Sequence, residues 1–228
     1  MYQSDKQPAD RAADACLKAV NARFNDELSR QIAGTLPPGH IYRLGHPSAI
    51  LLSAGLPNLP IEMAASRLAS KSVQANHPFD ISDVYDLVLF INSPIAVFNF
   101  ASLIEVRRRF GITRTSSALR SPCTNFPHGA QAKNIIVDIE RGGKQYLIGV
   151  YFNQMRRDII VSDIRGIFPK DNHEWLNWIT QGKADYLHKE KIQTLIDQQR
   201  INPAEVAYLD LDSVTKILQN FENPKCGG

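Results

Sequence analysis

Apolar side chains along the first part of the chain repeat at the spacing of an amphipathic helix. In residues 10–33 they recur at three- and four-residue intervals, with polar and charged residues between them: Leu17, Val20, Phe24, Leu28 and Ile32. This pattern predicts one long helix, which the Gly/Pro cluster within residues 34–39 ends. The cluster predicts a boundary between an N-terminal helical arm, residues 1–36, and a main domain, residues 37–228.

The next stretch alternates short apolar runs with turn residues. A short strand is followed by a turn at residues 45–47, and helices are predicted at residues 48–54 and 66–74. Ser82 is a residue type that caps helix N-termini, so a further helix is predicted from Ser82 to the Asn-Ser-Pro sequence that ends it. Residues 95–100 have the composition of a strand.

Beyond residue 133 the apolar pattern changes from a helical to an alternating period. The runs NIIVDIE, QYLIGVYF and IIVSDIRGIF predict three strands. Gly142-Gly143 suits a tight hairpin turn, a second turn is predicted at residues 153–157, and Pro169 is expected to end the third strand. Three sequential strands with short turns predict an antiparallel meander packed against helices, which is an α+β fold. Helices are predicted after Pro169, near residues 189–199 and near residues 213–221.

Composition sets the class of protein. The 228 residues are 43% hydrophobic and 21% charged, as in an ordinary globular protein, with a net charge of +3. The N-terminus has no apolar signal sequence and no run is long enough to span a membrane, so a cytoplasmic protein without a membrane partner is expected. Export by a route that ignores signal peptides stays open.

Positive charge is concentrated in one interval, residues 101–133, which we describe as a basic insertion. No acidic residue lies between Glu105 and Asp138. The cations of this interval are Arg107, Arg108, Arg109, Arg114, Arg120 and Lys133. Two interpretations stay open: a solvated loop, or a surface that contacts nucleic-acid phosphates.

Familiar catalytic and cofactor motifs are missing from the chain. It contains no Walker loop, GxGxxG, HExxH or GxSxG sequence. The three cysteines are far apart and lack metal-ligand spacing, so neither a zinc site nor a disulfide framework is expected. The sequence therefore predicts no metal and no cofactor.

A set of polar residues at chain bends could still carry phosphodiester chemistry. His77 precedes a proline, Ser162 and Arg165 lie on the third meander strand, and a second tier comprises His40, Arg43 and Lys170. A neutral histidine can take the proton of a ribose 2′-hydroxyl while fixed cations stabilise the phosphorane, without a metal. The alternatives are a turn histidine, a serine bonded to the backbone and a solvated lysine. Ser162 and Arg165 point to opposite faces of a regular strand, so they share a site only if the strand bulges.

Ordered blocks of the sequence resemble the phage MuF C-terminal domain family. They are GHIYRLGHPSAILLSAGLPNLPIEMAASRLASKS, HPFDISDV, NSPIAVFNF, VSDIRGIFPKDN, WLNWITQGKADYLHKEKI and SVTKILQNFENP, within residues 39–100 and 134–223. That family occurs on phage head proteins and in bacterial mobile-element and polymorphic-toxin proteins, and it is assigned to the barnase, EndoU, colicin and RelE-like nuclease superfamily. The chain departs from it in the long basic insertion and in lacking the MuF head domain.

The resemblance implies a barnase/RelE-like sheet and a metal-independent endoribonuclease, which would cleave RNA by 2′-hydroxyl attack and leave a cyclic phosphate. It implies His77 as acid/base, Arg165 as phosphate ligand and Ser162 as a hydrogen-bonding contact. An RNase toxin of this kind would act on tRNA or another cellular RNA and would be held in check by an immunity protein. The alternative is a non-catalytic module that binds nucleic acid or protein.

Overall fold

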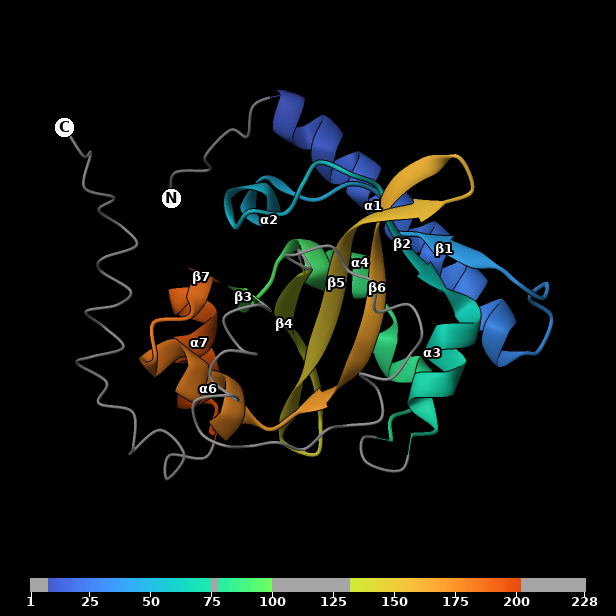
Figure 1. Ribbon diagram of the computed structural model, residues 1–228. Coiled ribbons are helices and arrows are strands. Elements are labelled where there is room, and N and C mark those ends of the chain that lie inside the picture. Colours follow the sequence, from blue (N-terminus) through green and yellow to red (C-terminus); the bar gives the residue numbers. More distant parts are fainter. Residues whose placement is uncertain (1–7, 75–77, 100–131, 202–228) are drawn as a thin grey trace.

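One seven-stranded sheet organises the part of the chain that the computed structural model describes, residues 8–74, 78–99 and 132–201 (Figure 1). The strands are β1 (Ile41–Arg43), β2 (Ile61–Ala64), β3 (Ala96–Asn99), β4 (Ala132–Arg141), β5 (Lys144–Arg156), β6 (Ile159–Lys170) and β7 (Ala184–Leu187). Their order across the sheet is β1-β2-β6-β5-β4-β3-β7. Neighbouring strands are antiparallel, except that β2 runs parallel to β6. The predicted α+β class is therefore confirmed.

Helices cover the two faces of this sheet. They are α1 (Pro8–Ile32), α2 (Ala49–Ser53), α3 (Ala65–Ser72), the 3-10 helix η1 (Ile81–Val84), α4 (Leu87–Asn92), α6 (Asn172–Thr180) and α7 (Lys189–Asp197). In Figure 1, α6 and α7 lie at one end of the sheet, far from α1 and α3 at the other. No helix within the described residues is long and apolar enough to cross a membrane.

The sheet separates two apolar cores, because successive strand residues point to opposite faces. In β4, Ile135 and Val137 belong to the first core and Ile136 to the second. Helices α1 to α4 contribute to the first core, and α6 and α7 contribute to the second. Two side chains of α1, Phe24 and Leu28, are buried in the first core. The helix predicted at residues 10–33 is thus confirmed, and it packs on the sheet as part of the main body.

Strands β4, β5 and β6 form the predicted antiparallel meander. Gly142 and Gly143 make the first turn, both with positive φ, as a tight hairpin turn with two left-handed residues requires. The third strand does not end at Pro169, because β6 continues to Lys170 and Pro169 pairs with Tyr146 of β5. Strand β2 pairs with β6 only at Ser162 and Asp163. Pro169 therefore lies where β6 has no second neighbour among the described strands, and its missing N–H breaks no ladder there.

Three other local predictions are corrected by the structure. Residues 153–156 belong to β5 rather than to a turn, with Asn153 in a left-handed conformation where the β5–β6 register shifts. The helix predicted from Ser82 is divided into η1 and α4 by Asp86, which also has positive φ. Asp80, not Ser82, is the N-cap, since its carboxylate accepts from the Ser82 backbone N–H.

Two short strands escaped the sequence patterns. Strand β2 leads directly into α3, and β7 lies between α6 and α7; each has only four residues. Both strands border helices, whose longer periodic pattern dominates the local sequence signal. The helix predicted near residues 213–221 lies outside the described residues.

Candidate functional site: an arginine cluster on the sheet

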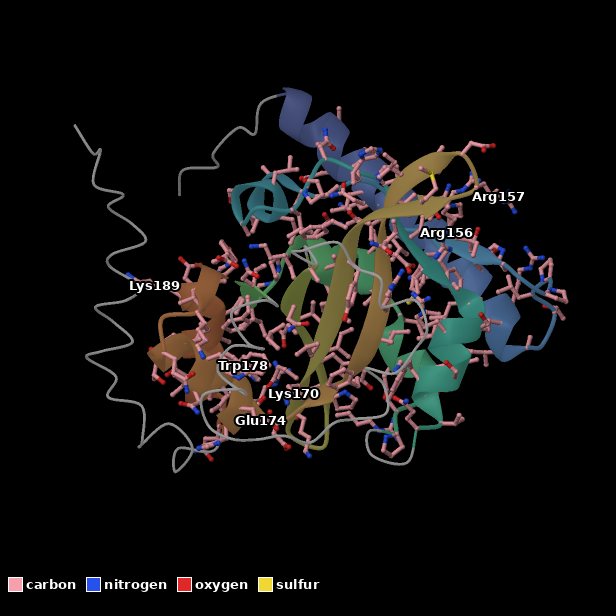
Figure 2. All side chains as sticks on the ribbon, viewed as in Figure 1. Arg156, Arg157, Lys170, Glu174, Trp178 and Lys189 are labelled. Carbon is pink, nitrogen blue, oxygen red and sulfur yellow. The ribbon has the colours of Figure 1, made fainter. Side chains whose placement is uncertain are left out.

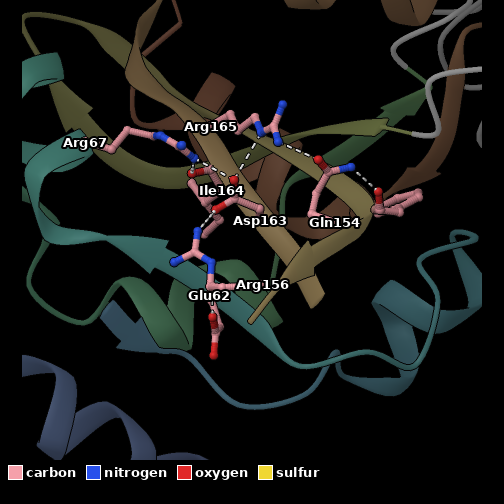
Figure 3. A network of polar contacts seen from close by, with 8 residues as sticks. Glu62, Arg67, Gln154, Arg156, Asp163, Ile164 and Arg165 are labelled. Atoms are coloured by element: carbon pink, nitrogen blue, oxygen red, sulfur yellow. Dashed lines mark hydrogen bonds and ion pairs between the residues drawn. The ribbon is translucent and has the colours of Figure 1, made fainter. Parts of the chain in front are cut away.

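Three arginines from separate elements meet at one carboxylate on the face of the sheet that carries the second core (Figure 3). The parallel register of β2 and β6 sets Glu62 beside Asp163. Ile61 and Met63 of β2 point into the first core, so Glu62 points to the opposite face. We call Glu62, Asp163 and the three arginines, Arg67, Arg156 and Arg165, the arginine cluster.

Both oxygens of the Asp163 carboxylate are occupied. Oδ2 accepts from Arg67 Nη1 at 2.8 Å and from Arg165 Nε at 3.0 Å. Oδ1 accepts from Arg156 Nη2 at 2.7 Å, and Arg156 Nε lies 3.4 Å from Glu62 Oε2. Hydrogen bonds between ionised groups are stronger than neutral ones, so these contacts fix the three guanidinium groups relative to one another.

The acids of the cluster are buried, whereas its arginines keep contact with solvent. The side chains of Asp163 and Glu62 are 4% and 5% exposed. Those of Arg67 and Arg165 are 29% and 31% exposed, and that of Arg156 is 22% exposed. Three arginines and two acids give the cluster a formal charge of +1, and the arginines are its more exposed members.

Among the described residues, the guanidinium groups of Arg67 and Arg165 retain unpaired N–H donors for an anion, and the unpaired Nη1 of Arg156 is buried. A guanidinium has five N–H donors. Arg67 uses Nη1 for Asp163 and for the Ile164 carbonyl, at 2.8 and 2.7 Å. Arg165 uses Nε for Asp163 and Nη2 for the Gln154 side chain. Among the described residues, no hydrogen bond involves Nε or Nη2 of Arg67 or Nη1 of Arg165, and these atoms can donate to a phosphate.

Tyr151 borders the cluster on β5. The Arg165 guanidinium carbon lies 5.2 Å from the centroid of its ring, a cation–π contact. Burial raises the pKa of Tyr151 above its ordinary value, and the positive charge of Arg165 offsets part of that rise. The phenol is therefore neutral at neutral pH, and its ring is a rigid aromatic surface beside the cations.

Irregular strand pairing surrounds these residues. The register of β5 against β6 shifts between Gly149 and Val150 and again between Tyr151 and Gln154. Bulges of this kind re-aim side chains and are common next to functional sites. At the first shift Arg165 is the additional residue on β6, since Ile164 pairs with Val150 and Gly166 with Gly149. This arrangement sets Arg165 beside Asp163.

Of the three residues predicted to be catalytic, Ser162 and Arg165 lie apart in the structure. Arg165 belongs to the arginine cluster, whereas Ser162 is fully buried, and its hydroxyl has no hydrogen-bond partner among the residues that the structure describes. Ser162 pairs with Ile61, which belongs to the first core, so the Ser162 side chain points to that face of the sheet. The Arg165 side chain lies on the opposite face, with the cluster. The bulge does not bring them together. His77 lies outside the described residues.

The second-tier residues have other surroundings. Lys170 is buried, forms an ion pair with Glu174, and lies 5.4 Å from the centroid of the Trp178 ring (Figure 2). His40 Nε2 lies 3.1 Å from Glu27 Oε2 of α1. Arg43 alone of this tier approaches the cluster, with Nε 4.0 Å from Glu62 Oε1, and its side chain is largely exposed.

Only one cation of the basic insertion is within the described residues. Lys133 is buried, and its Nζ lies 2.8 Å from Asp185 Oδ2 of β7. That contact links β4 to the strand at the far end of the sheet order. The five arginines predicted to contact nucleic acid lie outside the described residues: Arg107, Arg108, Arg109, Arg114 and Arg120.

Sequence reasoning missed four members of the cluster. Asp163 and Arg165 have the i, i+2 spacing of one strand face, which was a usable signal. No local sequence signal pointed to Glu62 or Arg67, because β2 was not recognised and α3 contacts β6 only in the folded chain.

Within the described ranges, no group of three or more His, Cys, Asp or Glu side chains is placed to hold a metal ion. Comparisons of the chain with protein-family models, with curated proteins and with solved structures give no match.

Proposed function

We propose that the protein is a metal-independent endoribonuclease whose arginine cluster binds the scissile phosphate. The observation that carries this proposal is the convergence of Arg67, Arg156 and Arg165 on the buried carboxylate of Asp163. Three guanidinium groups held at one place, with N–H donors left over on Arg67 and Arg165, match the charge and the geometry of a phosphodiester.

Cleavage would follow the route in which RNA supplies its own nucleophile. The ribose 2′-hydroxyl attacks phosphorus, the 5′-oxygen leaves, and the product ends in a 2′,3′-cyclic phosphate. The guanidinium donors of Arg67 and Arg165 would stabilise the additional negative charge on the phosphorane. Asp163 would act as a positioning residue, because its carboxylate keeps the guanidinium groups from turning into solvent.

A general base and a general acid complete the reaction. His77 remains our prediction for one of these roles, as an imidazole exchanges protons near neutral pH. Glu62 lies at the cluster but is nearly fully buried behind Arg156, so it is less suited to reach a ribose.

The wider parts of the proposal follow the resemblance to the MuF C-terminal domain family. An antiparallel meander with helices on it is compatible with a barnase/RelE-like domain. We propose a toxin or effector of phage or mobile-element origin, acting on tRNA or another cellular RNA and restrained by an immunity protein. The five arginines of the basic insertion would add affinity for the RNA backbone.

Incubation of the pure protein with total RNA in EDTA, followed by gel electrophoresis, tests the proposal. Wild-type protein should cleave the RNA, and Arg165→Ala and Arg67→Ala should cleave it far more slowly. Arg157→Ala, in the exposed β5–β6 turn (Figure 2), is the matched control and should cleave at the wild-type rate. Circular dichroism of each variant separates loss of chemistry from loss of fold.

Two results would count against the proposal. RNA that stays intact with correctly folded wild-type protein would exclude a general endoribonuclease. If the protein binds RNA without cleaving it, and arginine substitutions reduce the salt dependence of that binding, the non-catalytic binding module is favoured.

A further inference from the structure

Two further arginines continue the arginine cluster toward the edge of the sheet. The first is Arg43, which lies opposite Glu62 in the antiparallel register of β1 and β2. Residues opposite each other on neighbouring strands point to the same face, so Arg43 shares the face of the cluster. Its side chain is 73% exposed, far more than any arginine of the cluster.

Glu62 joins Arg43 to the cluster. Its Oε2 lies 3.4 Å from Arg156 Nε, and its Oε1 lies 4.0 Å from Arg43 Nε. Figure 3 shows Arg156 between Asp163 and Glu62. Acidic and basic groups therefore alternate across β6, β2 and β1, and an exposed arginine stands at the outer end.

The second is Arg23 of α1, which extends the cations past β1. Its Nη2 donates to the backbone carbonyl of Arg43 at 2.6 Å, and the residue is exposed. This bond uses one of its five guanidinium N–H donors, and among the described residues no ion pair involves Arg23. We call the arginine cluster together with Arg43 and Arg23 the arginine row.

Stability of the fold does not account for the exposed end of the row. A contact of 4.0 Å made by a largely exposed side chain contributes little to the free energy of unfolding. The Arg43 guanidinium forms no hydrogen bond with the described part of the chain, so its donors are left for a ligand. The two acids of the row, Glu62 and Asp163, are buried, so it is the arginines that face solvent.

The charge of the row indicates the kind of ligand. Five arginines and two acids give it a formal charge of +3, as large as the net charge of the whole chain. Positive charge gathered along one line of a surface is typical of a site for a nucleic-acid backbone, which carries one negative charge at each phosphate.

We propose that the arginine row binds the RNA backbone on one side of the scissile phosphate, so that the substrate is an oligonucleotide and not a dinucleotide. The proposal rests on the proposed function in taking RNA as the ligand and the cluster as the site of the scissile phosphate. Neighbouring strands lie about 4.8 Å apart, so Arg43 of β1 is about 10 Å across the sheet from Asp163 of β6. One phosphate cannot contact both ends of the row, whereas successive phosphates of one RNA strand can. Such contacts position the RNA without reading its bases.

Binding of RNA that cannot be cleaved tests the row. In 2′-O-methyl RNA the nucleophile is blocked. Fluorescence anisotropy gives the Kd of a labelled oligo-U hexamer, and competition against it gives the Kd of a dinucleotide with one phosphate. Wild-type protein should bind the hexamer about tenfold more tightly, or better, because the dinucleotide reaches only one part of the row.

Two substitutions remove the outer end of the row. Arg43→Ala should weaken hexamer binding about threefold. It should also reduce the slope of log affinity against log salt concentration by about 0.7, the value for one phosphate contact of a single strand. The double variant Arg23→Ala/Arg43→Ala should weaken hexamer binding about tenfold and reduce the advantage of the hexamer over the dinucleotide.

Two further variants make the test specific. Arg43→Lys keeps the charge and should keep most of the salt dependence. Arg30→Ala removes an exposed arginine from the last turn of α1, about two turns beyond Arg23, and is the matched control. It should keep the wild-type Kd and slope. Circular dichroism shows whether each variant is folded.

The proposal is overturned if the folded double variant binds the hexamer within twofold of wild type, or if it weakens hexamer and dinucleotide binding by the same factor. An effect of Arg30→Ala as large as that of Arg43→Ala would also overturn it. Failure of the nuclease is recognised separately. Hexamer binding that depends on Arg43 and Arg23, without cleavage of unmodified RNA, retains the row and rejects the nuclease. Cleavage of unmodified RNA, with hexamer binding unchanged in the double variant, does the reverse.

Discussion

Removing the carboxylate of Asp163 should destabilise the fold, because this group holds three guanidinium groups together. Its oxygens accept hydrogen bonds of 2.7–3.0 Å from Arg67, Arg156 and Arg165. In Asp163→Ala those three cations face one another with only Glu62 left to offset their charge. Their mutual repulsion then adds to the loss of three charge-assisted hydrogen bonds.

The size of the effect follows from burial. Breaking a buried ion pair by removing one partner costs about 3–5 kcal/mol of the free energy of unfolding. The Asp163 side chain is 4% exposed, but the arginine side chains are 22–31% exposed and regain water once the carboxylate is gone. We therefore expect the lower end of that range, about 3 kcal/mol. For a chain of this length it corresponds to a fall in Tm of about 6–12 °C.

Urea unfolding followed by circular dichroism measures the difference. Asp158→Ala removes a carboxylate from the exposed β5–β6 turn and should change the free energy of unfolding by less than about 0.5 kcal/mol. A loss below about 1 kcal/mol in Asp163→Ala, the size expected for an exposed pair, would refute the view that Asp163 organises the cluster.

Three other outcomes are expected. If α1 belongs to the main core, Leu28→Ala should lower the free energy of unfolding by about 2–5 kcal/mol. Ile32→Ala, at a half-exposed position of the same helix, should lower it much less. Equal effects of the two substitutions in urea unfolding would contradict this. Asn25 donates to the Asp86 carboxylate and lowers its pKa. A lowered pKa stabilises the fold above the unfolded value near 4, and this stabilisation is lost as the pH falls through the folded value. Asn25→Ala should therefore lower the urea midpoint more at pH 7 than at pH 3, and an equal shift would refute the linkage. Expression without an immunity partner should be toxic, and His77→Ala should restore growth; persistent toxicity would remove His77 from the mechanism.

The local parts of the fold were predictable where a pattern extended over many residues. The apolar repeat of α1 covers several turns, and the alternation of β4 and β5 is interrupted only by Gly142-Gly143. These signals depend on residues close together in the chain, and the structure confirms them. The predicted end of the third strand failed because the cost of proline depends on whether a second strand lies beside it.

The site depended on contacts between distant parts of the chain. The neighbouring positions of Glu62 and Asp163 follow from the parallel pairing of β2 with β6, which no local pattern encodes. Arg67 joins them because α3 contacts β6 in the folded chain. Asp86 breaks its helix because Asn21 and Asn25 of α1 hold it in a left-handed conformation. Sequence could suggest Arg165 as a phosphate ligand, but not the residues that position it.

The end groups of RNA fragments test the central claim most directly. Wild-type protein in EDTA should release fragments that end in a 2′,3′-cyclic phosphate, and Arg165→Ala should release them about 100-fold more slowly. Intact RNA, fragments that end in a 3′-hydroxyl, or an unchanged rate in folded Arg165→Ala would contradict the account.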